Sequence, residues 1–382
     1  MNSITKMLEK KLRILVVDDT IVYRKAVSDI LAEIPGVEVV GIAHNGKIAM
    51  SKIATLKPDL LTLDIEMPEM NGIEVLAELQ KHHPGVGVIM LSTLTADGSE
   101  MTMKALELGA FDFILKPQSS ANLQEGKNQI KSALQPMLEA FRNSRNAPSF
   151  LATKGVFTRI RTLPGKNVDF PAPPQTITGT SSRAKDSARR GKSEIITIGI
   201  STGGPNALSQ MLPHLPGDLG VPVLIVQHMP PVFTKSLAVY LDAKCALTVK
   251  EAEDAEPILP NTVYIAPGGK QMKLVASVDG KNRIIKLTND PPENSCKPAA
   301  DYLFRSVADY YVGRTTAVIM TGMGSDGTKG LQLLKQKGAF IIAQDEATCV
   351  VFGMPKVPIQ QGLADIVVPL NKIAEEIRKS LR

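Results

Sequence analysis

The chain has 382 residues, 43% of them hydrophobic, which suffices to bury the cores of roughly two or three domains and excludes a wholly disordered protein. The net charge of +6 suggests a nucleic-acid partner, but residues 143–192 carry ten Lys or Arg against two acids, so the excess of +8 there leaves about −2 elsewhere. The three cysteines, Cys245, Cys296 and Cys349, form no C-x-x-C pair, which argues against a disulfide framework and a zinc site and fits a reducing cytoplasm.

The first apolar run, residues 12–17, is followed directly by two aspartates. It is too short for a signal peptide or a membrane span, and no later run reaches the length needed to cross a bilayer. We therefore expect a cytoplasmic protein without membrane insertion.

Five short apolar runs alternate with helix-like stretches before residue 142. The expected strands are residues 12–17, 37–43, 60–63, 87–91 and 112–115, and the expected helices begin near Ile21, Gly46, Gly72, Ser99 and Ser120. Near-continuous apolar strands separated by helices indicate a parallel sheet with helices on both faces. In such a sheet, functional side chains gather at the carboxyl ends of the strands.

Three carboxylates follow the ends of the first and third expected strands: Asp18, Asp19 and Asp64. A single acid in this position is often only a helix N-cap. Three together repel one another unless a cation lies among them, and all-oxygen ligands suit Mg²⁺. We expect Asp64 to accept a phosphoryl group, with Asp18, Asp19 and Asp64 as metal ligands.

The fourth and fifth expected strands end in a hydroxyl and an ammonium group. Lys116 can neutralise the transferred oxygens, and Ser92 is preferred to Thr93 as the switch hydroxyl because side chains alternate along a strand. The segments "ILVVDDT", "DLLTLDIEMPEMNGIEVL", "VIMLST" and "ALELGAFDFILKP" resemble a bacterial response-regulator receiver domain. The resemblance implies a flavodoxin-like (βα)5 fold and phosphotransfer from a histidine kinase to Asp64.

A basic segment separates this unit from the rest of the chain. Residues 143–192 are rich in Pro, Ser, Thr and Gly and have poor periodicity, so we expect a linker there, between a domain at 10–142 and another at 193–382. The linker is either a solubilising tether or a docking segment for an acidic partner or anionic surface.

After the linker, strands and helices alternate again. Apolar runs occur at residues 195–200, 221–226, 263–266, 315–320, 339–343 and 366–368, and residues 273–287 are typical of an added β-hairpin. The pattern predicts a doubly wound, mainly parallel α/β domain. The sequence has no helix-turn-helix signature, so we expect no nucleic-acid partner.

A serine, a histidine and an aspartate follow three of these runs. Ser201 lies in a G-x-S-x-G turn, His228 follows the second run, and Asp326 follows the fourth, whereas His214 precedes its strand and should lie at the opposite edge. At one sheet edge the three residues can serve as nucleophile, general base and the carboxylate that orients the base.

The segment "TGMGSDG" also fits the spacing of a dinucleotide-binding loop, with Gly322, Gly324 and Gly327 at the glycine positions. Asp326 lies inside this loop, where its negative charge would face the phosphates. A nucleotide-dependent oxidoreductase and a non-enzymatic, partner-binding regulator remain as alternatives.

The order Ser, His, Asp differs from that of ordinary α/β-hydrolases. The segments "GISTGGP", "QHMPPVFTKSLA", "YIAPGG", "TGMGSDGTKGL" and "DEATCVVFGMP", after a receiver and a linker, resemble the chemotaxis protein-glutamate methylesterase/deamidase family, the CheB family. The resemblance implies hydrolysis of glutamyl methyl esters and deamidation of glutamines on methyl-accepting chemoreceptors, without a cofactor in the esterase site. It also implies that Met323 helps to hold the oxyanion and that Thr202 lies beside the nucleophile.

A receiver fused to a hydrolase suggests control by phosphorylation. We hypothesise that the unphosphorylated receiver covers the Ser201 edge of the sheet. Phosphorylation of Asp64 would then shift the population of molecules toward an open, active form.

Overall fold

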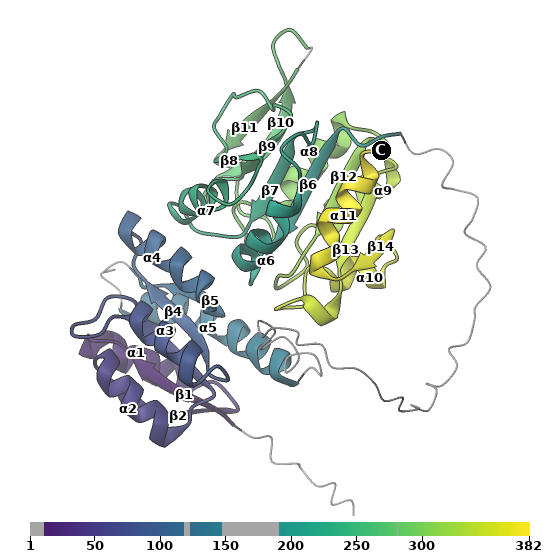
Figure 1. The fold of residues 1–382 in the computed structure, drawn as a ribbon. Coiled ribbons are helices and arrows are strands. Elements are labelled where there is room, and N and C mark those ends of the chain that lie inside the picture. The colour runs from purple at the N-terminus through teal and green to yellow at the C-terminus, as the bar shows by residue number, and fades with distance from the viewer. Residues whose placement is uncertain (1–10, 118–122, 147–190, 281) are drawn as a thin grey trace, which may run out of the picture.

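The computed structural model describes residues 11–117, 123–146, 191–280 and 282–382, which form two α/β units (Figure 1). The predicted linker lies largely outside these residues, so its extent and the domain boundaries stay predictions. Within the described part of the chain, no helix is both long and apolar enough to cross a membrane.

The N-terminal unit is a five-stranded parallel sheet in the order β2-β1-β3-β4-β5. Strands β1, β3, β4 and β5 are almost wholly buried on both faces, as an apolar parallel sheet requires, whereas the edge strand β2 is partly exposed. The strands are β1 (Leu12–Val17), β2 (Val37–Ala43), β3 (Leu60–Asp64), β4 (Gly87–Ser92) and β5 (Asp112–Leu115). The helices are α1 (Ile21–Ala32), α2 (Gly46–Leu56), α3 (Gly72–His82), α4 (Ala96–Glu107) and α5 (Leu123–Asn146). The predicted flavodoxin-like receiver fold is confirmed, and the start predicted at Ser120 falls outside the described residues.

The C-terminal unit has a seven-stranded sheet, ordered β14-β13-β12-β6-β7-β9-β8, whose neighbours are all parallel. The strands are β6 (Ile195–Ile200), β7 (Val223–Gln227), β8 (Thr248–Glu251), β9 (Thr262–Ile265), β12 (Thr315–Ile319), β13 (Phe340–Gln344) and β14 (Ile366–Val368). An antiparallel hairpin, β10 (Gln271–Ala276) and β11 (Arg283–Thr288), is attached to it as predicted.

The helices of this unit are α6 (Gly204–Met211), α7 (Phe233–Asp242), α8 (Ala300–Tyr310), α9 (Thr328–Gln336), α10 (Lys356–Gln360) and α11 (Leu370–Ser380). Strand β8 and helix α10 carry no sequence pattern that predicts them. Strand β8 is a short edge strand with an exposed threonine and half-buried polar residues, so it lacks an apolar run, and α10 has only five residues and contains Pro358.

The order in which successive strands are added to each sheet reverses at one pair of neighbouring, parallel strands. In the receiver this pair is β1 and β3, and in the C-terminal sheet it is β12 and β6, because β7, β9 and β8 extend to one side and β13 and β14 to the other. A crevice forms beyond the carboxyl ends of such a pair. Asp18 follows β1, Asp64 ends β3, Ser201 follows β6, and Asp326 lies in the loop after β12.

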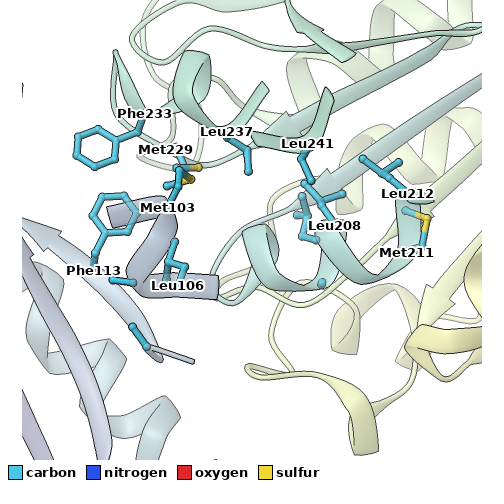
Figure 2. Packing of buried hydrophobic residues seen from close by; sticks show 14 of the residues in the cluster. Met103, Leu106, Phe113, Leu208, Met211, Leu212, Met229, Phe233, Leu237 and Leu241 are labelled. Atoms are coloured by element: carbon cyan, nitrogen blue, oxygen red, sulfur yellow. The ribbon is translucent and has the colours of Figure 1, made fainter. Parts of the chain in front are cut away.

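The two units share a continuous apolar contact. The Phe113 ring of β5 stacks on the Phe233 ring of α7 with centroids 4.7 Å apart, and Met103, Leu106 and Met229 surround them (Figure 2). Polar contacts flank this region: the hydroxyls of Ser99 and Ser236 are 2.6 Å apart, and Lys244 pairs with Glu107. The interface therefore joins β5 and α4 of the receiver to the α6 and α7 side of the other unit.

Phe113→Ala removes one ring of the stacked pair. We expect it to weaken the contact between the units by about 1–3 kcal/mol and to increase the radius of gyration of the full chain in small-angle X-ray scattering. Phe111→Ala is the matched control, since Phe111 packs against Phe141 inside the receiver. An unchanged radius in Phe113→Ala would argue that the stacking does not hold the units together.

Candidate active site

The turn after β6 brings Ser201 to the crevice between β6 and β12. Gly204 is required there because a Cβ atom would lie 1.9 Å from Gln227 Oε1, and Gln227 in turn donates a hydrogen bond of 2.9 Å to the Ser201 carbonyl. Across the crevice, a Cβ on Gly322 would lie 2.7 Å from Ser201 Cβ. Glycines thus permit the close backbone approach that sets the serine at the strand end.

Asp326 and His228 form a buried pair at the same edge. His228 Nε2 lies 2.8 Å from Asp326 Oδ2, and the Asp326 carboxylate also accepts hydrogen bonds from the backbone N–H groups of Ala300 (2.6 Å) and Asp301 (3.1 Å) and from Asn294 Nδ2 (2.8 Å). Burial raises the pKa of Asp326, but the hydrogen bond from His228 and these backbone donors outweigh it, so the pKa lies below its usual value. The carboxylate is therefore ionised at neutral pH.

The imidazole of His228 is held on both sides. Its Nδ1 lies 3.5 Å from Cys296 Sγ, and the structure shows no hydrogen bond between the His228 ring and the Ser201 hydroxyl among the residues described. Burial lowers the pKa of His228, but the hydrogen bonds with Asp326 and Cys296 raise it by more than burial lowers it. The net result is a pKa of about 9. In this conformation the ring is protonated at neutral pH.

The receiver forms one wall of the cavity that contains these groups. A cavity of about 370 Å³ is lined by Ser201, Thr202, His228 and Met323 and, from the receiver, by residues that include Asp112 and Phe113. Asp112 is buried, and burial raises its pKa to about 7 despite hydrogen bonds from the N–H groups of Phe113 and Gly203 and from Thr202. A receiver carboxyl group thus contacts the turn that carries Ser201.

The glycine loop after β12 belongs to this cavity. Gly324 and Gly327 have positive φ angles of 81° and 91°, and the Asp326 carboxylate faces four protein donors instead of open space. Met323 is 42% exposed and lines the cavity. His214 ends a 3-10 helix before β7 and is exposed, away from these groups.

Sequence reasoning did not find Asn294, Cys296 or Asp112 as parts of the site. Asn294 and Cys296 lie in the irregular segment between β11 and α8, where no spacing rule applies. The sequence predicts Asp112 only as the first residue of a strand, because a contact between the two units leaves no periodic signal in either.

The receiver crevice gathers the predicted acidic groups around Lys116. Lys116 Nζ lies 2.9 Å from Asp18 Oδ2 and 2.7 Å from Asp64 Oδ2, and each of Asp18, Asp19 and Asp64 has a carboxylate oxygen within 4.8 Å of the others. Burial raises the pKa of Asp64 to about 6, although Lys116 lowers it. A cavity of about 440 Å³ opens onto Asp19, Asp64 and Lys116. Three clustered carboxylates with one ammonium fit a divalent cation.

Ser92 is buried beside this crevice without facing it. Its hydroxyl donates to the Gly98 carbonyl of α4 (3.2 Å) and accepts from Thr102 Oγ1 (2.8 Å), whereas Thr93 lines the cavity. Side-chain alternation along β4 does not predict this orientation, because helix α4 offers the Ser92 hydroxyl two hydrogen-bond partners. A switch role for Ser92 therefore requires that its hydroxyl leave α4.

Both units of the chain are similar to known protein families. Residues 14–126 match the response regulator receiver domain, and residues 196–377 match the CheB methylesterase family. A protein-glutamate methylesterase/protein-glutamine glutaminase of Desulfotalea psychrophila is 60% identical over 369 residues, which cover 96% of this chain and 98% of that protein. The chain belongs to the CheB family. Its class, predicted from motifs, is thus confirmed as a receiver-linked protein-glutamate methylesterase/protein-glutamine glutaminase.

Two further CheB proteins are similar to this chain. The protein-glutamate methylesterase/protein-glutamine glutaminase of Geobacillus kaustophilus is 43% identical over 371 residues, which cover 96% of this chain and 98% of that protein. The crystal structure of the Thermotoga maritima CheB methylesterase catalytic domain is 46% identical and covers 50% of this chain and 99% of that domain, with a TM-score of 0.48. Receiver domains in general are phosphorylated with the help of Mg²⁺, and the clustered carboxylates suit that ion.

Asp326→Asn removes the negative charge that holds the His228 proton. We expect the His228 pKa to fall from about 9 toward its ordinary value near 6.5, measured by NMR titration of the imidazole. A raised His pKa stabilises the fold fully below the unfolded value near 6.5, and this contribution is lost as the pH rises through about 9. In the variant, the free energy of unfolding should no longer fall as the pH rises from about 6.5 to about 9 because of His228. An unchanged His228 titration would contradict the assignment.

Proposed function

We propose that Ser201, His228 and Asp326 are nucleophile, general base and orienting carboxylate in the hydrolysis of glutamyl methyl esters on methyl-accepting chemoreceptors. The observation that carries this proposal is the convergence of the three groups at the strand-order reversal of the sheet, with the carboxylate 2.8 Å from the imidazole. Deamidation of glutamine side chains follows the same course, with ammonia as the leaving group.

The arrangement assigns a role to each nitrogen of His228. Because Asp326 holds Nε2, Nδ1 is the nitrogen that takes the Ser201 proton, so the ring must first turn Nδ1 from the Cys296 sulfur toward the serine and lose its extra proton. Ser201 Oγ then bonds to the ester carbonyl carbon. The backbone N–H of Met323 stabilises the oxyanion, and Thr202 lines the same wall.

The attack of Ser201 on the ester gives a tetrahedral intermediate. Its collapse breaks the bond between the former carbonyl carbon and the methoxy oxygen. His228 gives its proton to that oxygen, methanol leaves, and Ser201 carries the acyl group. Water then attacks the acyl-enzyme with His228 again as base, which releases the glutamate carboxylate and restores the serine hydroxyl. These steps use only groups of this chain and water.

In the receiver, Asp64 accepts the phosphoryl group from the chemotaxis histidine kinase. Asp18, Asp19 and Asp64 would hold Mg²⁺, which neutralises the charge of the phosphoryl oxygens when it is bound. Lys116 already lies within 3 Å of two of these carboxylates and supplies a fixed positive charge.

The contacts of Ser92 connect this site to the interface between the units. If the Ser92 hydroxyl turns to a phosphoryl oxygen, its bonds with Gly98 and Thr102 in α4 are lost. The same helix carries Ser99, whose hydroxyl pairs with Ser236 of α7. Phosphorylation would thereby loosen α4 from α7 and shift the population toward molecules in which the receiver no longer walls the Ser201 cavity.

Ser201→Ala removes the nucleophile. We expect release of methanol from methylated receptor membranes to fall by at least about 10³-fold, because no other group replaces the attacking oxygen. Ser209→Ala, in helix α6 beside the turn, is the matched control and should keep nearly full activity. Normal activity of Ser201→Ala would overturn the proposal.

Asp64→Asn removes the phosphoryl acceptor. We expect acetyl phosphate with Mg²⁺ to raise methanol release about tenfold in the unaltered chain and to have no effect in the variant. The control is Asp29→Asn, which disturbs only a partly exposed ion pair of α1 with Lys127. Stimulation that persists in Asp64→Asn would place the phosphoryl group elsewhere.

A further inference from the structure

A tight turn between β11 and α8 reaches the catalytic groups from outside the sheet. Asn294 and Ser295 both have positive φ angles, 51° and 62°, and Glu293 and Cys296 exchange backbone hydrogen bonds of 3.1 and 2.7 Å. Two successive left-handed residues closed by two hydrogen bonds leave the backbone few alternatives. The turn therefore sets the directions of the side chains that it carries.

Two of those side chains contact the catalytic pair. Asn294 Nδ2 donates to Asp326 Oδ1 (2.8 Å) and to Asp301 Oδ2 (3.0 Å), and so lies between two buried carboxylates. The Cys296 thiol donates to the Asn294 carbonyl (3.4 Å), and its sulfur lies 3.5 Å from His228 Nδ1. One turn thus contacts both the orienting acid and the base.

The Cys296 sulfur lies beside Nδ1 of His228, the nitrogen that must accept the Ser201 proton in the proposed reaction. With Nε2 on Asp326 and Nδ1 on Cys296, the ring has a hydrogen-bond acceptor at each nitrogen, which favours the imidazolium form. Other charged or titratable groups near the ring are few in the described residues: Asp326 comes from the loop after β12, and Asp112 of β5 lines the same cavity.

We propose that Cys296 is a positioning residue for His228. When His228 does not contact Ser201, the Cys296 sulfur accepts a hydrogen bond from Nδ1–H of the ring. This hydrogen bond keeps the ring in the plane set by Asp326 and raises the proton affinity of Nδ1. Catalysis then exchanges sulfur for the Ser201 oxygen at Nδ1. The proposal rests on the proposed function and assigns to Cys296 a control of the base that the Ser201, His228 and Asp326 set does not include.

The pH dependence of kcat/KM tests this role, because its acid limb reports the base of the free enzyme. We expect the acid limb of Cys296→Ala to move to lower pH by about 1 unit, since an acceptor of the Nδ1 proton is lost. Cys296→Ser keeps a hydrogen-bond acceptor at this position, so its acid limb should lie close to that of the unaltered chain. All variants are measured as full-length chains with acetyl phosphate and Mg²⁺, so that an unphosphorylated receiver over the Ser201 cavity does not limit the rate.

Cys245→Ser is the matched control, because Cys245 is also a half-buried free thiol but follows the C-terminal end of α7, whereas Cys296 lies at His228 Nδ1. Its profile should equal that of the unaltered chain. A merely structural role for Cys296 predicts lower activity with an unmoved acid limb in both variants, and that result would overturn the proposal. Failure is distinguishable from failure of the proposed function, because only the latter leaves Ser201→Ala active.

Alkylation gives a second, independent measurement. Iodoacetamide forms a sulfur–carbon bond at Cys296, iodide leaves, the thiol proton passes to solvent, and the added group blocks Nδ1 from Ser201. We expect esterase activity to be lost at least tenfold faster in the unaltered chain and in Cys245→Ser than in Cys296→Ser. Equal rates of loss in Cys296→Ser and the unaltered chain would contradict the placement of the thiol beside the base.

Discussion

The buried carboxylate of Asp326 is the group on which the catalytic unit depends. It takes hydrogen bonds from His228, from Asn294 and from the first N–H groups of α8, so a single negative charge joins the ends of β7 and β12 to the turn after β11. A buried charge is tolerated only when donors surround it. His228 is one of these donors, so the requirement that keeps the carboxylate ionised also fixes the orientation of the imidazole.

Much of this arrangement was predictable from the sequence, because it rests on local patterns. Apolar runs located β6, β7 and β12, and the residues just beyond them, Ser201 and His228, follow from strand ends meeting at one sheet edge. The strand order could not be predicted, since it depends on which runs pair. Asn294 and Cys296 were also missed, because a turn with left-handed residues outside glycine has no pattern that separates it from any other loop.

The two units use one architectural solution for two chemistries. In each, carboxylates lie where the strand order reverses, but a lysine accompanies them in the receiver and a histidine in the hydrolase. The ammonium of Lys116 stays charged and suits a phosphoryl group, whereas an imidazole can gain and lose a proton within a turnover. The interface connects the two sites through α4, whose hydroxyl contacts reach from Ser92 on one side to Ser236 on the other.

The two members of the His228–Asp326 pair come from distant parts of the chain. His228 and Asp326 are 98 residues apart, and β12 pairs with β6 only after the intervening strands, hairpin and helices have been made. Contacts between such distant segments form late in folding, because the loop between them must close first. Esterase activity therefore appears only when nearly the whole unit has folded, so a chain still emerging from the ribosome cannot act on receptors.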